Sequence, residues 1–472
     1  MELRAIIGLE IHVEMNTKSK MFSNAPVSFG QLPNTQVGLF DMAFPGTMPT
    51  VNKQAVINAI RVSNALNMTI DNVLLFDRKN YFYSDLPKGY QITQYFRPIG
   101  REGYLTFKNG EKDTKINIER LHLEEDTCKQ FHVDDFSYLD YNRAGIPIIE
   151  IVTKPEFSSG KEVRNFVEAI RSIVVFLGVS NGKMEDGNIR VDLNVSIEDS
   201  NKNWGKVEIK NLNSLSNIEK AINYEVNRQK DLVLKGKSIE KETRRYDEIN
   251  DRTVKLRVKV DSVDYRYFTD PNIPPIKLSD EFIKEAIETS PELASSKQER
   301  YKSLGLSDYE ANLITNSKES CDYFEKGLET GCSPKTLANW INIQVQKVLK
   351  LRDISINEFS IAAQELGELV LLVEEHKINN SQAKSIFNEA VETGIKIIDI
   401  INKRELNQIV DENEIIDLIN EIINSNQNLV NDYKNGKEKV VGYIVGLVMS
   451  KTQRKADPSL TNKLTIEELR RR

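Results

Sequence analysis

The sequence predicts an α+β protein, with a large β-rich N-terminal domain followed by an α-helical domain and a small helical tail domain. Up to about residue 275, apolar or alternating runs are separated by turn signals such as Asn109-Gly110 and Lys235-Gly236, which is typical of strands. Beyond about residue 280, apolar residues recur at helical spacing almost everywhere. The 472 residues exceed one ordinary domain. We therefore expect three domains, at 1–290, 291–400 and 401–472.

The first predicted strand covers residues 8–15. Side chains alternate across a strand, so Glu10, His12 and Glu14 share one face, and four apolar residues share the other. The apolar face is the expected core. The polar face is the candidate for chemistry.

Two further strand-like segments carry carboxylates among apolar residues. Glu150 is the single charge in the run 146–152, and burying it without a partner would cost several kcal/mol. It therefore needs a cation, a hydrogen-bond donor or a proton. In the segment 121–126, Glu125 is in phase with Leu121 and Leu123, so we expect it to turn toward the apolar side.

Three separated carboxylates and one imidazole suggest a divalent-metal site, formed by Glu10, His12, Glu125 and Glu150. Oxygen ligands favour Mg²⁺, and the histidine leaves Mn²⁺ open. Zinc is not expected, because the three cysteines form no C-x-x-C pair.

An alternative interpretation stays open for several of these residues. A lone His12 also fits a packing histidine, and Glu14 and Glu124 are interpreted as surface charges. Additional polar residues in strand or turn settings indicate a polar, partly basic cleft: Lys79, Lys88, Asn142, Arg143, Arg190, Asp192, Asn194 and Lys210.

Helices are predicted near 52–66 and 161–177, the second ended by Gly178. The proline-rich stretch 270–275 is interpreted as a linker. Later stripes of apolar residues predict helices through 362–373 and 383–391, the latter followed by Gly394 as a stop.

The charge pattern favours a soluble protein with one basic end. The whole chain has a formal net charge of −6, but residues 434–472 hold ten basic residues against four acidic ones. Such a helical tail suits a phosphate backbone, although a solvated terminal helix explains it equally well. With no apolar run of 18 residues and no cleavable leader, we expect a cytoplasmic protein without a membrane segment.

The same polar strings resemble the B subunit of the tRNA-dependent amidotransferase, the GatB family of GatCAB complexes. The similarity runs in order through segments 7–14, 76–83, 86–92, 121–126, 142–152, 208–214, 242–245, 264–268 and 442–446. These strings span essentially the whole chain.

The resemblance implies a ligase that forms a carbon–nitrogen bond with glutamine as amide donor. Its N-terminal domain, the cradle, would bind ATP, a divalent metal and the aminoacylated 3′ end of tRNA(Gln) or tRNA(Asn). The side-chain carboxylate of Glu or Asp would be phosphorylated and then amidated by ammonia. The helical and tail domains would hold the tRNA body, and a GatA-like amidase subunit and a small GatC-like subunit would complete a heterotrimer.

On this basis we expect metal ligation by Glu10, His12, Glu125 and Glu150. The catalytic candidates are Lys79, Asp192, Asn142 and Arg143. The residues expected to bind ATP are Arg190, Asn194, Lys210 and Lys88.

The chain also departs from the family pattern. Some members carry a cysteine-bound zinc in the cradle, whereas this chain has Ser23 in that context, so no zinc is expected. There is no P-loop and no Ser-Lys amidase segment, so ATP would bind in an unusual site and ammonia would come from the partner. Two other functions stay open: a metal-dependent RNA phosphohydrolase, and a tRNA-binding protein without catalysis.

Overall fold

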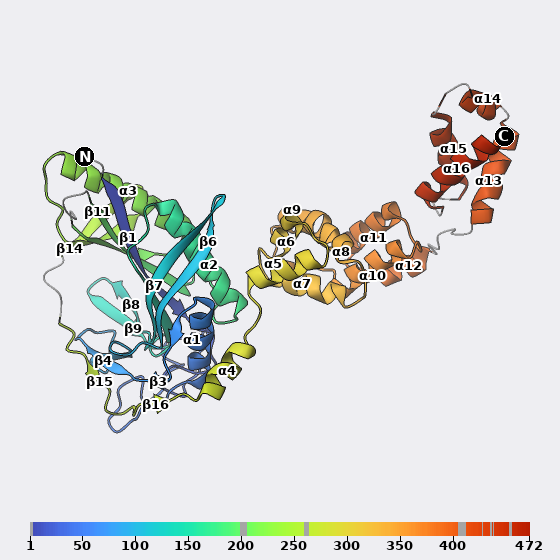
Figure 1. Ribbon diagram of the computed structural model, residues 1–472. Coiled ribbons are helices and arrows are strands. Elements are labelled where there is room, and N and C mark those ends of the chain that lie inside the picture. The colour runs from blue at the N-terminus through green and yellow to red at the C-terminus, as the bar shows by residue number, and fades with distance from the viewer. Residues whose placement is uncertain are drawn as a thin grey trace. The chain divides into compact units, whose positions relative to one another are not determined.

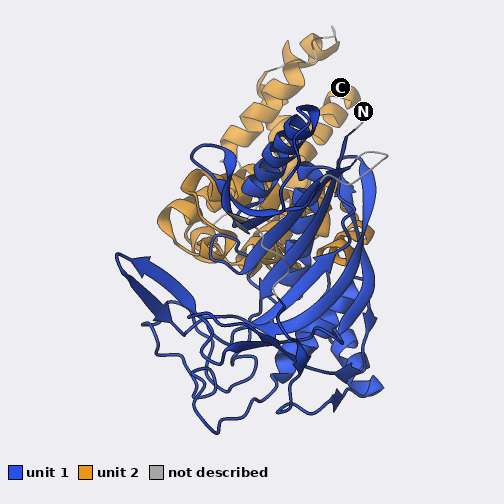
Figure 2. Cartoon of the chain, turned by 90° about the vertical axis from the view of Figure 1, so that its left-hand side faces the viewer, with its two compact units in different colours: residues 1–293 blue, residues 294–472 orange. Residues whose placement is uncertain are grey.

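The computed structural model describes residues 3–198, 205–258, 264–404, 412–426, 428–434, 437, 439–452 and 456–472. The chain divides into two compact units, Met1–Leu293 and Ala294–Arg472 (Figure 2). Among the described residues, strands β1 to β16 all lie in the first unit, and the second unit is helical. This confirms the α+β class. No described helix combines the length and apolar character that crossing a membrane requires.

A nine-stranded sheet organises the first unit, with β1 near its middle (Figure 1). Its order is β14-β13-β12-β11-β1-β10-β7-β6-β2. The strands, in chain order, are β1 Arg4–Glu14, β2 Thr69–Ile70, β6 Gly100–Asn109, β7 Lys112–Glu125, β10 Pro147–Thr153, β11 Ile189–Glu198, β12 Val207–Leu212, β13 Glu242–Asp247 and β14 Arg252–Val258. All neighbouring pairs are antiparallel except β12 and β13, which are parallel.

The register of β1 brings together side chains that are far apart in sequence. His12 lies opposite Glu150 of β10 and opposite Arg190 of β11, while Glu150 lies opposite His122 of β7. Residues directly opposite one another share a face of the sheet. This polar face therefore collects charged residues from four adjacent strands.

The other face of the sheet carries the core. Leu9, Ile11 and Val13 are at most 1% exposed, as the alternation predicts. Helices α1 (Lys53–Ala65), α2 (Gly160–Phe176) and α3 (Leu215–Leu234) contribute to the same hydrophobic core, and α2 packs along α3 (Figure 1).

The capping residues explain where these helices begin and end. Asn52 and Ser159 accept hydrogen bonds from backbone N–H groups in the first turns of α1 and α2. After α2 the chain turns at Gly178, whose φ of +68° is a conformation that favours glycine. Both helices match the predicted ranges.

Smaller strands lie outside the nine-stranded sheet. Strands β4 (Asp77–Asn80), β5 (Tyr90–Thr93) and β15 (Phe268–Thr269) form a three-stranded sheet, while β3 (Val73–Leu74) pairs with β16 (Ile276–Lys277) and β8 (Lys129–Val133) pairs with β9 (Phe136–Asp140). The interpretation of 270–275 as an interdomain linker is wrong. It connects β15 to β16 inside the first unit, where Asp270 is buried 2.7 Å from the Arg78 guanidinium. Helix α4 (Asp280–Glu288) follows and packs against α1.

The second unit consists of short helices: α5 Ala294–Ser303, α6 Asp308–Ile314, α7 Lys318–Leu328, α8 Pro334–Trp340, a π-helical turn Ile341–Val345, α9 Gln346–Arg352, a 3₁₀ turn Ile356–Glu358, α10 Ala363–Glu374, α11 Asn380–Thr393, α12 Ile397–Arg404, α13 Glu412–Ser425, α14 Asn428–Lys434, α15 Lys439–Lys451 and α16 Pro458–Arg471. The stop predicted at Gly394 is confirmed by its φ of +72° at the end of α11.

The expected boundary at residue 401 falls inside α12, which packs against α10 and α11. Helices α13, α15 and α16 form a separate hydrophobic core. Three of the charged residues counted in the tail, Glu438, Arg454 and Lys455, lie outside the described residues.

Candidate active site

Four titratable side chains meet on the polar face of the sheet. Glu150 of β10 lies between two imidazoles, with its Oε2 3.4 Å from His12 Nε2 and 3.2 Å from His122 Nε2. Glu124 of β7 closes the group, with Oε1 3.6 Å from His12 Nε2. The partner that Glu150 requires is therefore supplied by these two histidines.

The donor set of this cluster fits a divalent cation. One ligand atom each from His12, Glu124 and Glu150 can be chosen so that all lie within 4.8 Å of one another. Two carboxylates suit Mg²⁺, which retains water or phosphate ligands at its other positions, and an imidazole is also compatible with Mn²⁺.

Electrostatics favour ionised carboxylates here. Burial by itself would raise the pKa of Glu150, but His122 and His12 hold that pKa well below its usual range. Burial by itself would lower the pKa of His12, and the carboxylates of Glu150 and Glu124 instead raise it to about 9. Without a metal ion, the protonated histidines thus balance the buried carboxylates; a bound cation would take over this role, and His12 would ligate it as the neutral imidazole.

The strand register corrects the expectation that Glu125 belongs to this cluster. Glu124 pairs with Ile148, on the face of Glu150, so Glu125 points to the opposite face, in phase with Leu123. There, Glu125 accepts a hydrogen bond from Lys88 Nζ at 2.8 Å and another from the Ile92 N–H at 3.0 Å.

The interpretation of Glu14 and Glu124 as surface charges is also wrong. Their relative exposures are only 6% and 3%. Glu14 lies 3.7 Å from the Arg190 guanidinium, which also contacts Asp126 at 2.7 Å.

Glu10 belongs to a neighbouring polar array on β1, β11 and β12. Its Oε1 accepts a hydrogen bond from Asn194 Nδ2 at 3.3 Å. Asp192, opposite Glu10, lies 3.0 Å from Lys210 Nζ, which is also 3.0 Å from Glu208. Burial raises the pKa of Glu10, and the charges of Glu150 and Asp192 add to this effect. Both effects favour the protonated form of Glu10.

Two of the predicted catalytic residues form hydrogen bonds with backbone groups. Arg143 donates to the carbonyl oxygens of Thr127 and Cys128 at 3.0 and 2.9 Å. The Asn142 amide donates to the Leu32 carbonyl oxygen and accepts from the Gln36 N–H, both at 2.8 Å. Their geometry fits loop positioning, and the catalytic roles expected for them stay predictions.

Lys79 is the predicted cation best placed to meet an anion from outside. Among described residues its ammonium makes no ion pair with a carboxylate, but lies 5.0 Å from the ring centroid of Tyr265. Burial would lower the pKa of Lys79, but electrostatic interactions, first with the Glu124 carboxylate and then with Tyr267 and Glu150, raise it instead. Lys79 therefore stays charged beside the cluster.

His122 was not predicted as a site residue. The signal was nevertheless present, since alternation in 121–125 places His122 and Glu124 opposite Leu121 and Leu123. Its Nδ1 is buried without a hydrogen-bond partner among the described residues.

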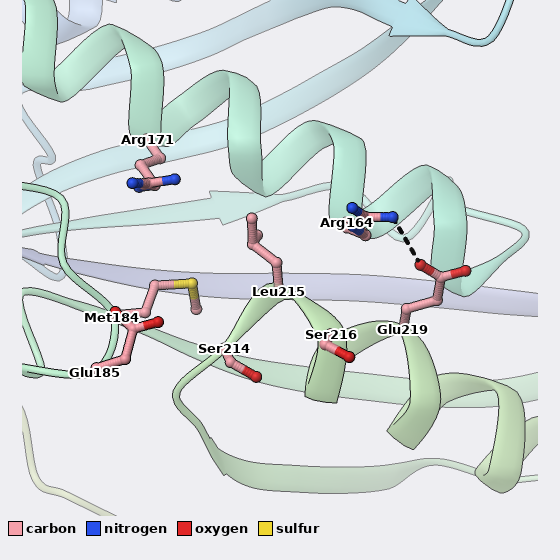
Figure 3. A pocket seen from close by; sticks show the side chains of 8 residues that line it. All are labelled: Arg164, Arg171, Met184, Glu185, Ser214, Leu215, Ser216 and Glu219. Atoms are coloured by element: carbon pink, nitrogen blue, oxygen red, sulfur yellow. Dashed lines mark hydrogen bonds and ion pairs between the residues drawn. The ribbon is translucent and has the colours of Figure 1, made fainter. Parts of the chain in front are cut away.

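A cavity of about 430 Å³ lies apart from this cluster (Figure 3). It is bounded by α2, the turn at Met184 and Glu185, and the start of α3, which belong to the helical layer over the core face. Arg164 at its edge lies 3.4 Å from Glu219. None of the predicted site residues lines it.

Comparisons with known proteins cover nearly the whole chain. Residues 5–284 match the GatB/GatE catalytic domain, and residues 322–469 match the GatB domain. The B subunit of the aspartyl/glutamyl-tRNA(Asn/Gln) amidotransferase of Mycoplasma capricolum is 45% identical over 470 residues, covering 98% of each chain. The protein of the same name from Bacillus cereus strain AH187 is 41% identical over 476 residues, covering 100% of each chain.

Proposed function

The chain belongs to the family of aspartyl/glutamyl-tRNA(Asn/Gln) amidotransferase B subunits, and on that premise we propose that it converts Glu-tRNA(Gln), Asp-tRNA(Asn) or both to the amidated forms. The reaction uses ATP to activate the side-chain carboxylate and ammonia to displace the phosphate. The observation that supports this is the convergence of His12, Glu124 and Glu150 within 4.8 Å, with Lys79 beside them.

A carboxylate is a poor electrophile toward ammonia until one of its oxygens becomes part of a phosphate leaving group. Phosphoryl transfer depends mostly on positioning and on neutralising phosphate charge. When bound, Mg²⁺ or Mn²⁺ would supply part of that neutralisation. His12, Glu124 and Glu150 are the residues that would hold it, and Lys79 would add a positive charge at the edge of the cluster.

Ammonia must arrive at the acyl phosphate unprotonated. We assign the proton acceptor to Glu10, because it lies on the same face of β1 as His12, two residues away, and because burial and neighbouring carboxylates raise its pKa. The proton of an incoming ammonium ion would pass to a Glu10 carboxylate oxygen, and the resulting ammonia would attack the activated carbon. Asn194 and the Asp192–Lys210 pair would position Glu10 through the contacts described above.

Other subunits are part of this proposal. The chain contains no recognisable amidase segment, so a partner amidase would release ammonia from glutamine, and a small third subunit would complete the complex. The basic residues of the tail would contact the tRNA body. We further propose that the protein works in the cytoplasm and needs no zinc.

An amidation assay tests the proposal. The complex is supplied with labelled Glu-tRNA(Gln), ATP, Mg²⁺ and ammonium chloride, so that glutamine hydrolysis is bypassed. We expect Gln-tRNA(Gln) from the parent, at least tenfold less from Glu124→Gln or Glu150→Gln, and an unchanged yield from Glu119→Gln on the exposed side of β7. If neither Glu-tRNA(Gln) nor Asp-tRNA(Asn) is amidated with ATP, the proposal fails. Cleavage of RNA without ATP would instead support the phosphohydrolase.

A further inference from the structure

Four tyrosines gather around Lys79 from segments far apart in sequence. We call Tyr81, Tyr95, Tyr265 and Tyr267 the tyrosine shelf. The rings of Tyr95 and Tyr267 stack, with centroids 3.9 Å apart and an interplanar angle of 8°. Tyr265 joins them edge to face, 6.0 Å from Tyr267 and 5.8 Å from Tyr81.

The shelf is not part of the hydrophobic core. Tyr95 keeps 53% of its surface exposed although Tyr267 covers one face of its ring, and Phe96, whose ring lies edge to face with that of Tyr95, is 58% exposed. Exposed apolar surface of this kind marks binding sites when it is contiguous. These rings therefore form a platform that is open to a ligand.

Lys79 connects the shelf to the His12–Glu124–Glu150 cluster. The Lys79 ammonium lies 5.0 Å from the Tyr265 ring centroid and 5.9 Å from that of Tyr81. The same ammonium is close enough to Glu124 and Glu150 to interact with both charges. A ligand on the shelf would thus have one end beside the cluster.

The backbone holds the shelf in place. Asn80 of β4 donates its N–H to the Tyr265 carbonyl oxygen at 2.9 Å and its side-chain amide to the Arg266 carbonyl oxygen at 2.8 Å. Tyr95 and Phe96 both donate their N–H groups to Asp77 Oδ2, at 2.8 and 2.9 Å. The ring positions are thus fixed by strand β4 on both sides.

We propose that the tyrosine shelf stacks the unpaired nucleobases at the 3′ end of the tRNA, so that the attached amino acid reaches the His12–Glu124–Glu150 cluster. Aromatic rings beside a cation are the usual platform for single-stranded nucleic acid. This proposal rests on the proposed function. The adenine of ATP presents the same stacking chemistry. The exposed ring of Phe96 meets that of Tyr95 edge to face, with centroids 5.2 Å apart, so a second open ring lies beyond the Tyr95–Tyr267 stack, which suits a run of bases better than one adenine.

Steady-state amidation distinguishes the two nucleobase sources. Tyr95→Leu and Tyr267→Leu should raise the KM for aminoacyl-tRNA by about 5- to 150-fold with the KM for ATP unchanged, since one base–aromatic stack is lost. Tyr95→Phe should behave as the parent because it keeps the ring. Tyr104→Leu is the matched control, a tyrosine on β6 that lies under Lys115 instead.

A binding measurement that needs no turnover completes the test. The full complex is titrated with a tRNA(Gln) transcript and with the same transcript lacking its last two unpaired nucleotides. The deletion should weaken binding to the parent and to Tyr104→Leu by the same factor, and should weaken binding to Tyr95→Leu and Tyr267→Leu much less.

Each outcome has a distinct meaning. An equal loss of affinity on deletion in parent and shelf variants overturns the proposal. So does a rise in the KM for ATP alone, which would assign the shelf to adenine. A parent complex without amidation activity refutes the proposed function, while the binding comparison still tests stacking.

Discussion

The clearest test of the strand register is Glu125→Gln. If Glu125 lies on the core face of β7, the variant should lose stability, whereas on the polar face it should lose metal affinity. Glu125 is 1% exposed and its carboxylate lies 2.8 Å from Lys88 Nζ. Two unit charges at that distance attract by about 6 kcal/mol at an effective dielectric constant of about 20. Part of this offsets desolvation, and removing one partner of a buried pair typically costs about 3–5 kcal/mol. We expect Glu125→Gln to destabilise the first unit by that amount and to leave metal affinity intact.

Urea unfolding of the full chain, followed by far-UV circular dichroism, measures this cost. At about 2–3 kcal/mol per M of urea, the transition of the first unit should move down by roughly 1–2.5 M. The double variant Glu125→Leu/Lys88→Met should recover most of the loss, because a buried ion pair can be replaced by apolar residues of similar volume. An unchanged midpoint combined with weaker Mn²⁺ binding would refute this placement of Glu125.

Three further predictions follow from the described geometry. Glu124→Gln and Glu150→Gln should each weaken Mn²⁺ binding to the full chain at least tenfold in calorimetric titrations, and unchanged affinity would remove them from the proposed ligand set. Burial by itself would raise the pKa of Glu325, but hydrogen bonds from nearby cations and from Tyr301 lower that pKa instead. The resulting stabilisation is thus present above the unfolded pKa of about 4.3 and is lost as the pH falls. Glu325→Gln should lower the free energy of unfolding by about 1–3 kcal/mol at pH 7, and this difference from the parent should shrink below about pH 4. Urea titrations at several pH values measure it, and a difference that stays constant with pH would contradict the prediction. A Cβ on Gly103 would lie 2.6 Å from a backbone carbonyl oxygen, whereas one on Gly446 meets nothing within 4 Å. Gly103→Ala should therefore lower the free energy of unfolding by about 1–3 kcal/mol, whereas Gly446→Ala should raise it by up to about 1 kcal/mol. Thermal unfolding measures both, and equal effects would contradict the difference in packing.

Local periodicity was sufficient to predict the secondary structure around the site. The alternation in residues 8–15 identified the core face of β1 because each residue's side is set by its immediate neighbours. The stops at Gly178 and Gly394 likewise located the ends of α2 and α11, because a glycine with positive φ acts within one turn of the helix end.

Which side chains meet on the polar face was harder to predict, because this depends on cross-strand register. Nothing local to 121–126 says which of its two glutamates lies beside Glu150. That choice is made by the pairing of β7 with β10, which places Ile148 opposite Glu124. Grouping Glu125 with Glu10 and His12 mixed the two faces of the sheet. The tyrosine shelf was equally hidden, because Tyr81 and Tyr265 are brought together only by the pairing of β4 with β15.

The position of β1 has a consequence for synthesis on the ribosome. This strand is made first, yet its two sheet neighbours begin at Pro147 and Ile189. At about 5–20 residues per second, β1 waits roughly 9–35 s for β11 to begin to emerge. Both edges of β1 are unpaired until β10 has been made, and the edge that pairs with β11 stays unpaired for the whole interval, which is the state in which strands aggregate. We therefore expect nascent chains that stall before residue 189 to be bound by ribosome-associated chaperones, and those that have passed residue 198 to be released from them.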